Sequence, residues 1–165
     1  MQDPFALLDL EVRFDLDPAA LESRFLDVSS RCHPDRFTDP LEQADAADRM
    51  SQVTAAYQTL RDDEQRANAL LALRGGPGKS DDKSLPPELL MEMMEVRESL
   101  DEAVAGGDAA AIEKHRAWAV EKRGEHLATI GKLFEQDLSD KNAAAIRLQL
   151  NGLRYIERML EQMPG

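Results

Sequence analysis

Apolar residues in the first half of the chain recur at intervals of three and four positions, the period of one face of an α-helix. One stripe follows Asp17-Pro18 and another follows Asp39-Pro40, and each pair places a capping aspartate before a proline in the first helical turn. The stripes are Leu21, Phe25, Val28 and Cys32, and then Met50, Val53, Tyr57 and Leu60. We therefore predict two long amphipathic helices that pack antiparallel across a short polar loop.

Shorter elements complete this part of the chain. A short helix with Phe5, Leu7, Leu8 and Leu10 is expected to close the core, and another helix is expected over 64–74. The stretch 75–84 contains three glycines and has almost nothing to bury, which is typical of a linker. We therefore divide the chain into a first domain at 1–74, a linker at 75–85 and a second domain at 86–165.

The second half carries three helix signals. Pro86-Pro87 starts a helix to about Ala105, Gly106-Gly107-Asp108 ends it and caps the next, and Ser139-Asp140 caps a third. Core stripes are expected at Leu89, Met93, Val96, Leu100 and Val104 on the first of these helices, and at Ile146, Leu150, Leu153 and Leu160 on the last. The chain is also poor in β-branched and aromatic residues. We predict an all-α fold, a helical hairpin followed by a three-helix bundle.

Charge and composition narrow the possible partners. Asp and Glu outnumber Lys and Arg by 32 to 20, and the net charge of −12 argues against binding to nucleic acid or to a membrane. Cys32 is the only cysteine, so no disulfide within the chain and no zinc finger is expected. The acidic N-terminus lacks a basic region and a long apolar run. We expect a cytoplasmic protein of bacterial type, although a mature organellar protein would look the same.

The tripeptide His33-Pro34-Asp35 lies between the two apolar stripes of the first domain. Pro34 fixes its own φ and pushes His33 out of the helical region, so the tripeptide should form a rigid corner with its side chains exposed. Such a corner has two interpretations. It either serves as a binding loop or simply ends a helix, and the tripeptide alone favours neither.

Context favours the first interpretation. A short helix, a helix bearing Arg24 and Arg31, the corner from His33 to Phe37 and an antiparallel helix together resemble a J-domain over roughly residues 1–72. The resemblance implies that the tripeptide contacts the ATPase domain of a DnaK-type chaperone, where Asp35 engages an arginine. It assigns His33, Pro34, Asp35, Arg36, Arg24 and Arg31 to this contact. The second helix of many J-domains is rich in lysine, whereas here Glu22 and Asp27 dilute the positive charge.

Apolar residues are left over on two helices of the second domain. Leu90, Met91 and Met94 lie outside the core stripe and share their side with Glu95, Glu98, Asp101 and Glu102, and Leu148, Tyr155 and Met159 are the surplus on the last helix. One interpretation is a broad helix that packs against two neighbours. The other is a docking surface, because an apolar patch with an acidic border suits a basic partner with an apolar tip.

The segment 89–102, placed after a J-domain and before two more helices, closely resembles the C-terminal domain of the HscB family. These are J-domain co-chaperones of iron–sulfur cluster assembly. The resemblance implies two partners, the chaperone HscA and the scaffold protein IscU. It assigns the scaffold contact to Leu90, Met91, Met94, Glu95, Glu98, Glu102 and Tyr155. The chain has no pair of CxxC motifs, which favours the bacterial form of the family.

The leading hypothesis is therefore a non-catalytic co-chaperone that stimulates the chaperone ATPase and delivers the scaffold. We expect no catalytic residue, cofactor or metal, because no motif for such a site stands out. Cys32 is expected to be a buried thiol, Trp118 a core residue, and His115 and His126 surface residues. The alternatives are a structural helical adaptor without ATPase coupling and a general J-domain co-chaperone for unfolded clients.

Overall fold

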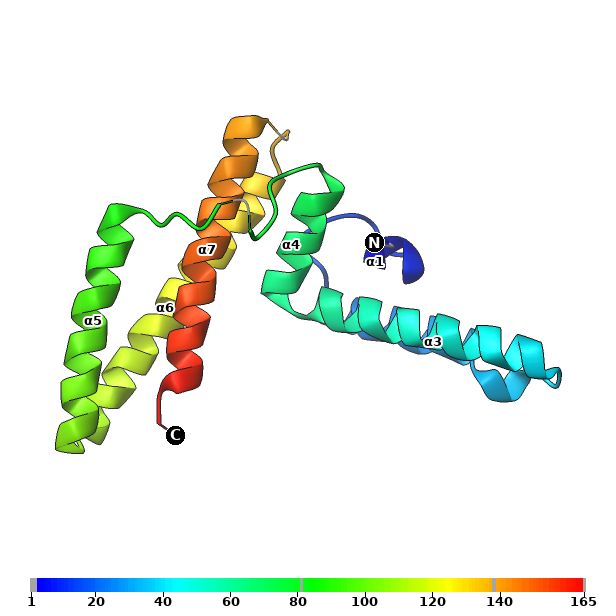
Figure 1. The fold of residues 1–165 in the computed structure, drawn as a ribbon, viewed down its shortest axis with the longest axis horizontal. Coiled ribbons are helices and arrows are strands. Elements are labelled where there is room, and N and C mark those ends of the chain that lie inside the picture. Colours follow the sequence, from blue (N-terminus) through cyan, green and yellow to red (C-terminus); the bar gives the residue numbers. More distant parts are fainter. Residues whose placement is uncertain (1–2, 81, 138, 165) are drawn as a thin grey trace. The chain divides into compact units, whose positions relative to one another are not determined.

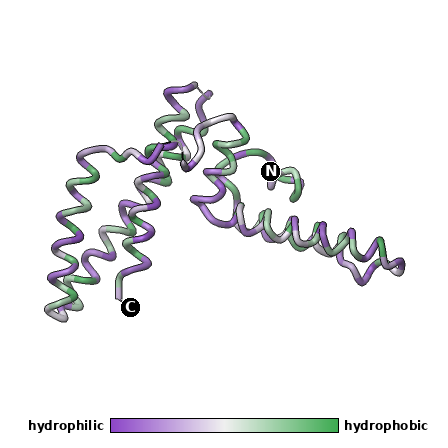
Figure 2. The backbone as a smooth tube through the Cα atoms, in the orientation of Figure 1, coloured by the Kyte–Doolittle hydropathy of each residue, from purple (hydrophilic) through white to green (hydrophobic). Residues whose placement is uncertain are grey.

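The computed structural model describes residues 3–80, 82–137 and 139–164, and within these ranges it is helical, with no strand (Figure 1). Residue contacts divide the chain into two units, Met1–Gly75 and Gly76–Gly165. Hydrophobic and hydrophilic positions alternate along the helices (Figure 2), as expected for amphipathic helices that bury one face. The predicted all-α fold is confirmed.

The first unit contains α1 (Pro4–Leu7), α2 (Pro18–Arg31), the 3₁₀ turn η1 (Pro34–Arg36), α3 (Pro40–Arg61) and α4 (Asp63–Leu73). The predicted start signals cap their helices. The Asp17 carboxylate accepts a hydrogen bond from the Ala19 N–H at 3.0 Å, and Asp39 accepts one from Leu41 at 2.9 Å. Both helices therefore begin where the sequence predicts.

The core of the first unit is formed by the predicted stripes. Phe5 and Leu8 are fully buried against α3, whose Val53 and Leu60 are also fully buried. The rings of Phe25 and Tyr57 stack at 4.3 Å between centroids and join α2 to α3. These contacts hold the helical hairpin together and fix the loop at its end.

The second unit is a bundle of α5 (Pro87–Gly106), α6 (Ala109–Phe134) and α7 (Asp140–Gln162). Gly107 ends α5 with φ +66°, a left-handed conformation that favours glycine, and Asp108 caps α6 through the Ala111 N–H at 3.0 Å. Helix α6 packs against both other helices and most closely against α7. The three predicted helices are confirmed.

The predicted core face of α5 is wrong at one position. Val104 is 46% exposed, whereas its neighbour Ala103 is buried. The two side chains point about 100° apart on the helix, and the small alanine lets the end of α5 lie close to the bundle. On α7, Ile156 is fully buried although the predicted stripe omitted it, and Leu160 is only half-buried.

The glycine-rich segment that precedes α5 is held against α7. The guanidinium of Arg147, which is 1% exposed, donates from Nε and Nη2 to the Pro77 carbonyl at 3.2 and 2.8 Å. The Asn151 side-chain amide donates to the carbonyls of Asp82 and Ser84 at 3.1 and 3.0 Å. The backbone carbonyls of Pro77, Asp82 and Ser84 thus attach this segment to α7 within the second unit.

Candidate functional site

The loop between α2 and α3 forms the corner that the sequence predicts. His33 has extended backbone (φ −68°, ψ 130°), and Pro34–Arg36 form a single 3₁₀ turn. The His33 Nδ1 lies 3.3 Å from the Asp35 backbone N and 3.6 Å from its Oδ2, so the histidine side chain folds back onto the turn. The Asp35 side chain is 89% exposed. The corner thus presents a carboxylate to solvent on a backbone that its own turn holds.

Both flanking helices brace this corner. Arg36 donates from Nη1 to the Ser30 carbonyl near the end of α2 at 3.2 Å. From α3, Gln43 donates from Nε2 to the Phe37 carbonyl at 2.8 Å. Arg36 was assigned to the chaperone contact, and in the structure its guanidinium also supports the loop from within.

Arg24 and Arg31 lie on α2 in a network of ion pairs with two aspartates. Arg31 contacts Asp27 at 2.9 Å and Asp9 at 3.7 Å, and Arg24 contacts Asp9 at 3.4 Å and Asp27 at 3.8 Å. Arg24 also donates to the backbone carbonyl of Asp9, which has the positive φ of 50° that is uncommon outside glycine. Asp9 therefore cancels positive charge on α2 as Asp27 does, whereas Glu22 makes no ion pair with either arginine.

Cys32 is buried, as predicted. Its Sγ lies 3.7 Å from the Ser29 carbonyl oxygen and 3.9 Å from the Met50 Sδ. His115 and His126, predicted at the surface, are half-buried and contact the Ser99 Oγ and the Gln149 Oε1 at 3.1 and 2.7 Å. In the described part of the chain, no group of three His, Cys, Asp or Glu side chains is placed to hold a metal ion, and no helix is long and apolar enough to cross a membrane.

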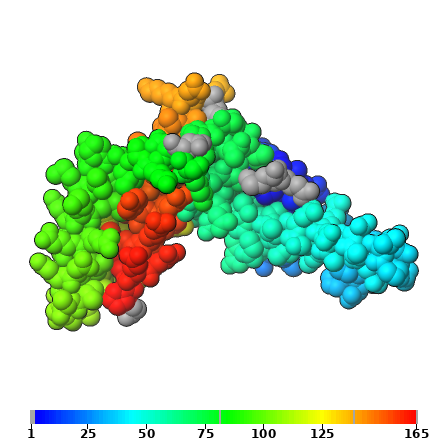
Figure 3. Space-filling view, viewed as in Figure 1, coloured from blue at the N-terminus to red at the C-terminus, as the bar shows by residue number. Residues whose placement is uncertain are grey.

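A second candidate surface lies on α5 and α7, which border each other on the face of the bundle shown in Figure 3. Four apolar side chains of these two helices that were assigned to the scaffold contact are exposed: Leu90 at 44%, Met91 at 64%, Met94 at 65% and Tyr155 at 48%. Met93 on the same helix is buried in the bundle core. The surplus residues of α5 therefore do not fill the core, and the interpretation as a broad packed helix is wrong for them.

The acidic residues of α5 differ according to the side they face. Glu92 faces α6, where it contacts the Lys122 ammonium at 3.4 Å and accepts from the Trp118 indole at 3.3 Å. Burial acts to lower the pKa of Lys122, but its hydrogen bond with Glu125 and the charge of Glu92 outweigh burial and raise that pKa. The outward acids take no part in an ion pair or hydrogen bond within the described chain; they are Glu95, Glu98, Asp101 and Glu102.

The apolar residues border two hollows. A groove of about 520 Å³ runs between α5 and α7, with Leu90, Met94, Val104, Tyr155 and Met159 among its lining residues. A shallower hollow of about 770 Å³ on α5 is lined by Met91 and by all four outward acids. The seven residues assigned to the scaffold contact thus gather around two adjoining hollows, because Met94 borders both.

Several residues that line the groove were not predicted as part of a binding surface, whereas Met159 was predicted to lie outside the core together with Tyr155. The residues not predicted there are Arg97, Arg158 and Gln162, and Val104, which was predicted in the core. Leu148, which was grouped with Tyr155, is half-buried and does not line the groove. Arg97 and Arg158 each lie three positions after an exposed residue of the patch, Met94 and Tyr155, so the i, i+3 spacing on the helix surface was the available signal.

Comparison with known proteins bears on both surfaces. A family model described as the DnaJ domain matches residues 3–69, and one described as the HSCB C-terminal oligomerisation domain matches residues 85–163. The co-chaperone protein HscB homologue of Burkholderia multivorans is 33% identical over 165 residues, which cover 96% of this chain and 90% of the relative. The homologue of Ralstonia nicotianae is 35% identical over 157 residues, 93% of this chain and 89% of that relative.

Solved structures show the same likeness over both units. The human co-chaperone protein HscB matches with a TM-score of 0.85 and 27% identity, over 99% of this chain and 81% of that one. The chaperone HscB from Vibrio cholerae matches with a TM-score of 0.80 and 30% identity, over 98% and 95% of the two chains. The arrangement of a J-domain followed by a three-helix domain is therefore shared along nearly the whole chain.

Proposed function

The chain belongs to the HscB family of J-domain co-chaperones, and from this premise we propose that it stimulates the ATPase of the DnaK-type chaperone HscA and delivers the iron–sulfur scaffold IscU to it. It would thereby assist the maturation of iron–sulfur proteins in the cytoplasm. The chain acts as a regulator: it performs no chemistry, and ATP hydrolysis takes place on the chaperone.

The chaperone contact is assigned to His33, Pro34, Asp35 and Arg36, with Arg24 and Arg31 beside them. The exposed carboxylate of Asp35 supports this assignment, because a short side chain on a braced turn pairs with a guanidinium at little cost in conformational entropy. Asp9 and Asp27 offset the charge of the two arginines of α2. The contact therefore depends more on the corner than on long-range attraction by α2.

The observation that carries the proposal is the apolar surface of α5 and α7 with its unpaired carboxylates. Leu90, Met91, Met94 and Tyr155 are exposed in water, where each large apolar side chain loses the free energy that burial supplies. Among the described residues, Glu95, Glu98 and Glu102 make no ion pair. A scaffold with basic and apolar residues would bury the apolar side chains and pair with the carboxylates.

A single chain with both contacts explains how the activator and the client are combined. A scaffold bound to the second unit is carried to the chaperone that the first unit engages, so its binding there becomes an intramolecular event at high effective concentration. The proposal therefore predicts synergy: scaffold and co-chaperone together stimulate the chaperone ATPase more than the sum of their separate effects.

Replacement of Asp35 by Asn tests the chaperone contact. The variant keeps the size of the side chain but removes its charge, and loss of a charge-assisted hydrogen bond of about 1.5–3 kcal/mol weakens binding roughly 10-fold or more. We expect stimulation of the chaperone ATPase to fall accordingly, measured as steady-state ATP hydrolysis with and without an IscU-type scaffold. Binding of the scaffold to the variant should stay unchanged.

Asp48→Asn is the matched control, because Asp48 is an exposed aspartate of α3 outside the corner. Full stimulation by Asp35→Asn would contradict the assignment of the corner. Lack of stimulation by the unmodified protein would favour a structural adaptor instead. Equal binding of many unfolded chains, with no dependence on Glu95 or Glu98, would favour a general client binder.

A further inference from the structure

We propose that the groove between α5 and α7 binds an acidic side chain of the scaffold through Arg97 and Arg158, so that the docking surface carries opposite charges on its two sides and fixes the orientation of its partner. This inference rests on the proposed function and deepens it. It adds a basic side to a surface that the assigned residues alone make purely acidic.

Both arginines are exposed at the groove, and neither makes an ion pair or a hydrogen bond within the described chain. Even Asp101, one turn after Arg97 on α5, does not pair with it. Other arginines of the second unit are engaged: Arg123 contacts Glu157 at 3.2 Å, and Arg116 contacts Glu113 at 3.4 Å. The chain has 32 acidic and 20 basic residues, yet these two arginines beside an apolar groove pair with no carboxylate of the described residues. They are therefore available for a partner's carboxylate.

The charges are distributed unequally between the two hollows. Met94, Arg97 and Asp101 border both and form the ridge between them. Glu95, Glu98 and Glu102 line only the outer hollow, whereas Arg158 lines only the groove. The groove therefore has two arginines against one aspartate, and the outer hollow has four acids against one arginine.

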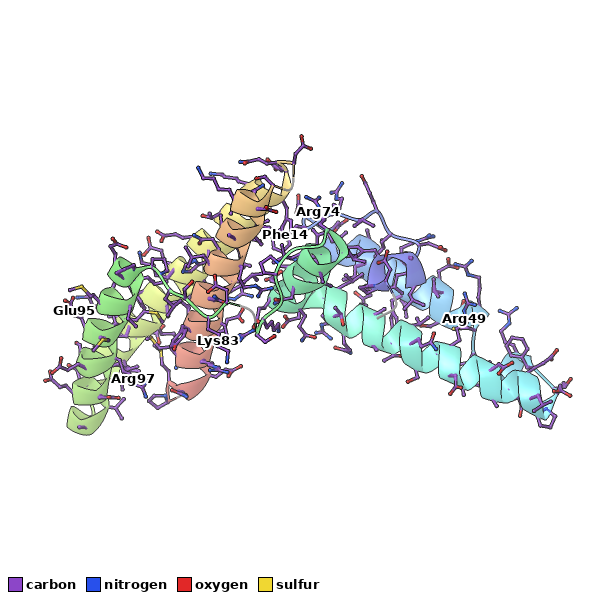
Figure 4. The ribbon with its side chains drawn as sticks, turned by 45° about the horizontal axis from the view of Figure 1, so that its top comes forward. Phe14, Arg49, Arg74, Lys83, Glu95 and Arg97 are labelled. Atoms are coloured by element: carbon purple, nitrogen blue, oxygen red, sulfur yellow. The ribbon has the colours of Figure 1, made fainter. Side chains whose placement is uncertain are left out.

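Helix geometry directs Glu95 and Arg97 to different sides of α5, although Arg97 on the ridge borders both hollows. Glu95 and Arg97 are two positions apart on α5, which corresponds to about 200° around the helix axis, and they lie on different sides of it (Figure 4). A partner turned end for end would bring its acidic group to the glutamates and its basic group to the arginines. The penalty for like charges in that arrangement selects one orientation.

The chemistry of the groove also defines what enters it. The groove is lined by the apolar residues Leu90, Met93, Val104 and Met159, and Arg158 on α7 lines it as well. A segment with an apolar side chain in the groove and an aspartate or glutamate next to it would satisfy both features. A guanidinium suits that task because it binds a carboxylate through two parallel hydrogen bonds.

Charge reversal at both arginines tests the inference, because the two interpretations of the surface predict opposite changes in the dissociation constant. The experiment measures the dissociation constant of the full chain for an IscU-type scaffold, for the unmodified protein and for Arg97→Glu/Arg158→Glu, at low and at high salt. We expect the double variant to bind about 10-fold more weakly at low salt, with a smaller difference at high salt. A surface that attracts its partner only by negative charge would give the opposite result, because the variant adds negative charge.

Control variants show whether a change in binding comes from the two arginines themselves or from a general change in charge or folding. Lys114→Glu makes the same charge change at an exposed residue of α6 outside the groove and should leave binding nearly unchanged. Arg97→Gln/Arg158→Gln, which adds no repulsion, should weaken binding by a smaller factor. Replacement of the matching scaffold acid by lysine should restore binding to the double-Glu variant.

Tighter or unchanged binding by the double-Glu variant would overturn the basic side of the surface, even though the scaffold still bound. Failure of the unmodified chain to bind the scaffold would instead overturn the proposed function. Circular dichroism of each variant shows whether the helices are retained. If the double-Glu variant were unfolded, unchanged binding by the folded glutamine variant would overturn the inference.

Discussion

Gly152 lies within α7 at a point of close contact with the other two helices of its bundle. A Cβ atom added there would lie 2.7 Å from the His126 Cε1 and 2.9 Å from the Leu89 Cδ2. The His126 ring makes a 2.7 Å hydrogen bond with the Gln149 side chain, so a shift of the ring also displaces Gln149. The glycine is therefore required by helix packing, although its backbone is ordinary helix.

Gly152→Ala should consequently destabilise the second unit. Alanine is better by up to about 1 kcal/mol in a helix, but the displacement of His126 and Leu89 costs about 1–3 kcal/mol. We expect a net loss of roughly 1 kcal/mol in the free energy of unfolding, measured by urea titration with the fluorescence of Trp118, the single tryptophan of the chain.

Gly124→Ala provides the contrast, because no atom lies within 4 Å of a Cβ at this position of α6. This variant should gain up to about 1 kcal/mol. An equal gain at both glycines would show that the bundle accommodates a methyl group at position 152 and would contradict the packing argument.

At the level of single residues, the sequence predicted the features that depend on residues nearby in the chain. The caps Asp17, Asp39 and Asp108 and the extended backbone of His33 follow from residues within three positions. The role of Asp9 could not be predicted, because its contact with Arg24 spans fifteen positions and depends on how α1 packs. The role of Gly152 could not be predicted either, because its close contacts are with Leu89 and His126 on other helices.

At the level of elements, α5 is a helix with two apolar faces. Leu89, Met93 and Leu100 fill the bundle core, while Leu90, Met91 and Met94 remain exposed. Because the exposed residues contribute little to the core, their replacement affects binding and folding differently.

Leu90→Ala/Met94→Ala should therefore weaken scaffold binding by about 2 kcal/mol or more, which is roughly 30-fold, if these side chains are binding hot spots. The melting temperature should change less than for a core substitution, because Leu90 is 44% and Met94 65% exposed in the unbound protein. Isothermal titration with an IscU-type scaffold and thermal unfolding would measure the two quantities.

Val120→Ala serves as control, because Val120 is 57% exposed on α6 and lines neither hollow. It should leave the dissociation constant unchanged. Should the double variant bind as tightly as the unmodified chain, the apolar patch would have no role in scaffold binding.

Helix periodicity predicted most of the element-level structure, including both surfaces of α5. It failed where a helix meets more than one neighbour. Val104 satisfied the period but lies at the groove, and Ile156 was omitted although it is fully buried. A helical wheel gives the direction of a side chain around its own axis, but not which directions the neighbouring helices cover.

At the level of the whole molecule, the connection between the two units is more ordered than its composition predicts. Its glycines identified it as a linker, but Arg147 resembles a surface residue of α7 in the sequence and is in fact buried against this segment. Hydrogen bonds from Ser84 and the charge of Arg147 lower the pKa of Asp82. The ionised form therefore supports the attached segment above the usual pKa of aspartate, and this support is lost as the pH falls through the lowered value.

Arg147→Met should release the segment while it keeps the buried volume nearly constant. The loss of charge-assisted hydrogen bonds to Pro77 costs about 1.5–3 kcal/mol. We expect trypsin to cleave faster after Lys79 and Lys83, followed by mass spectrometry, at a temperature where the helices remain folded. Lys141→Met, an exposed position of α7, should leave both rates unchanged, and unchanged rates for Arg147→Met itself would show that the segment is held by other contacts.

The attachment of this segment to α7 limits where residues can be inserted between α4 and α5. A flexible tether of ten residues spans about 17 Å on average. Only three residues, Arg74 to Gly76, separate Leu73 at the end of α4 from Pro77, and these four Cα–Cα steps reach at most about 14 Å. Insertions within 77–84 would disrupt the hydrogen bonds to α7. A series of linker variants that uses this chain as a molecular ruler should therefore place its added residues between Gly75 and Gly76.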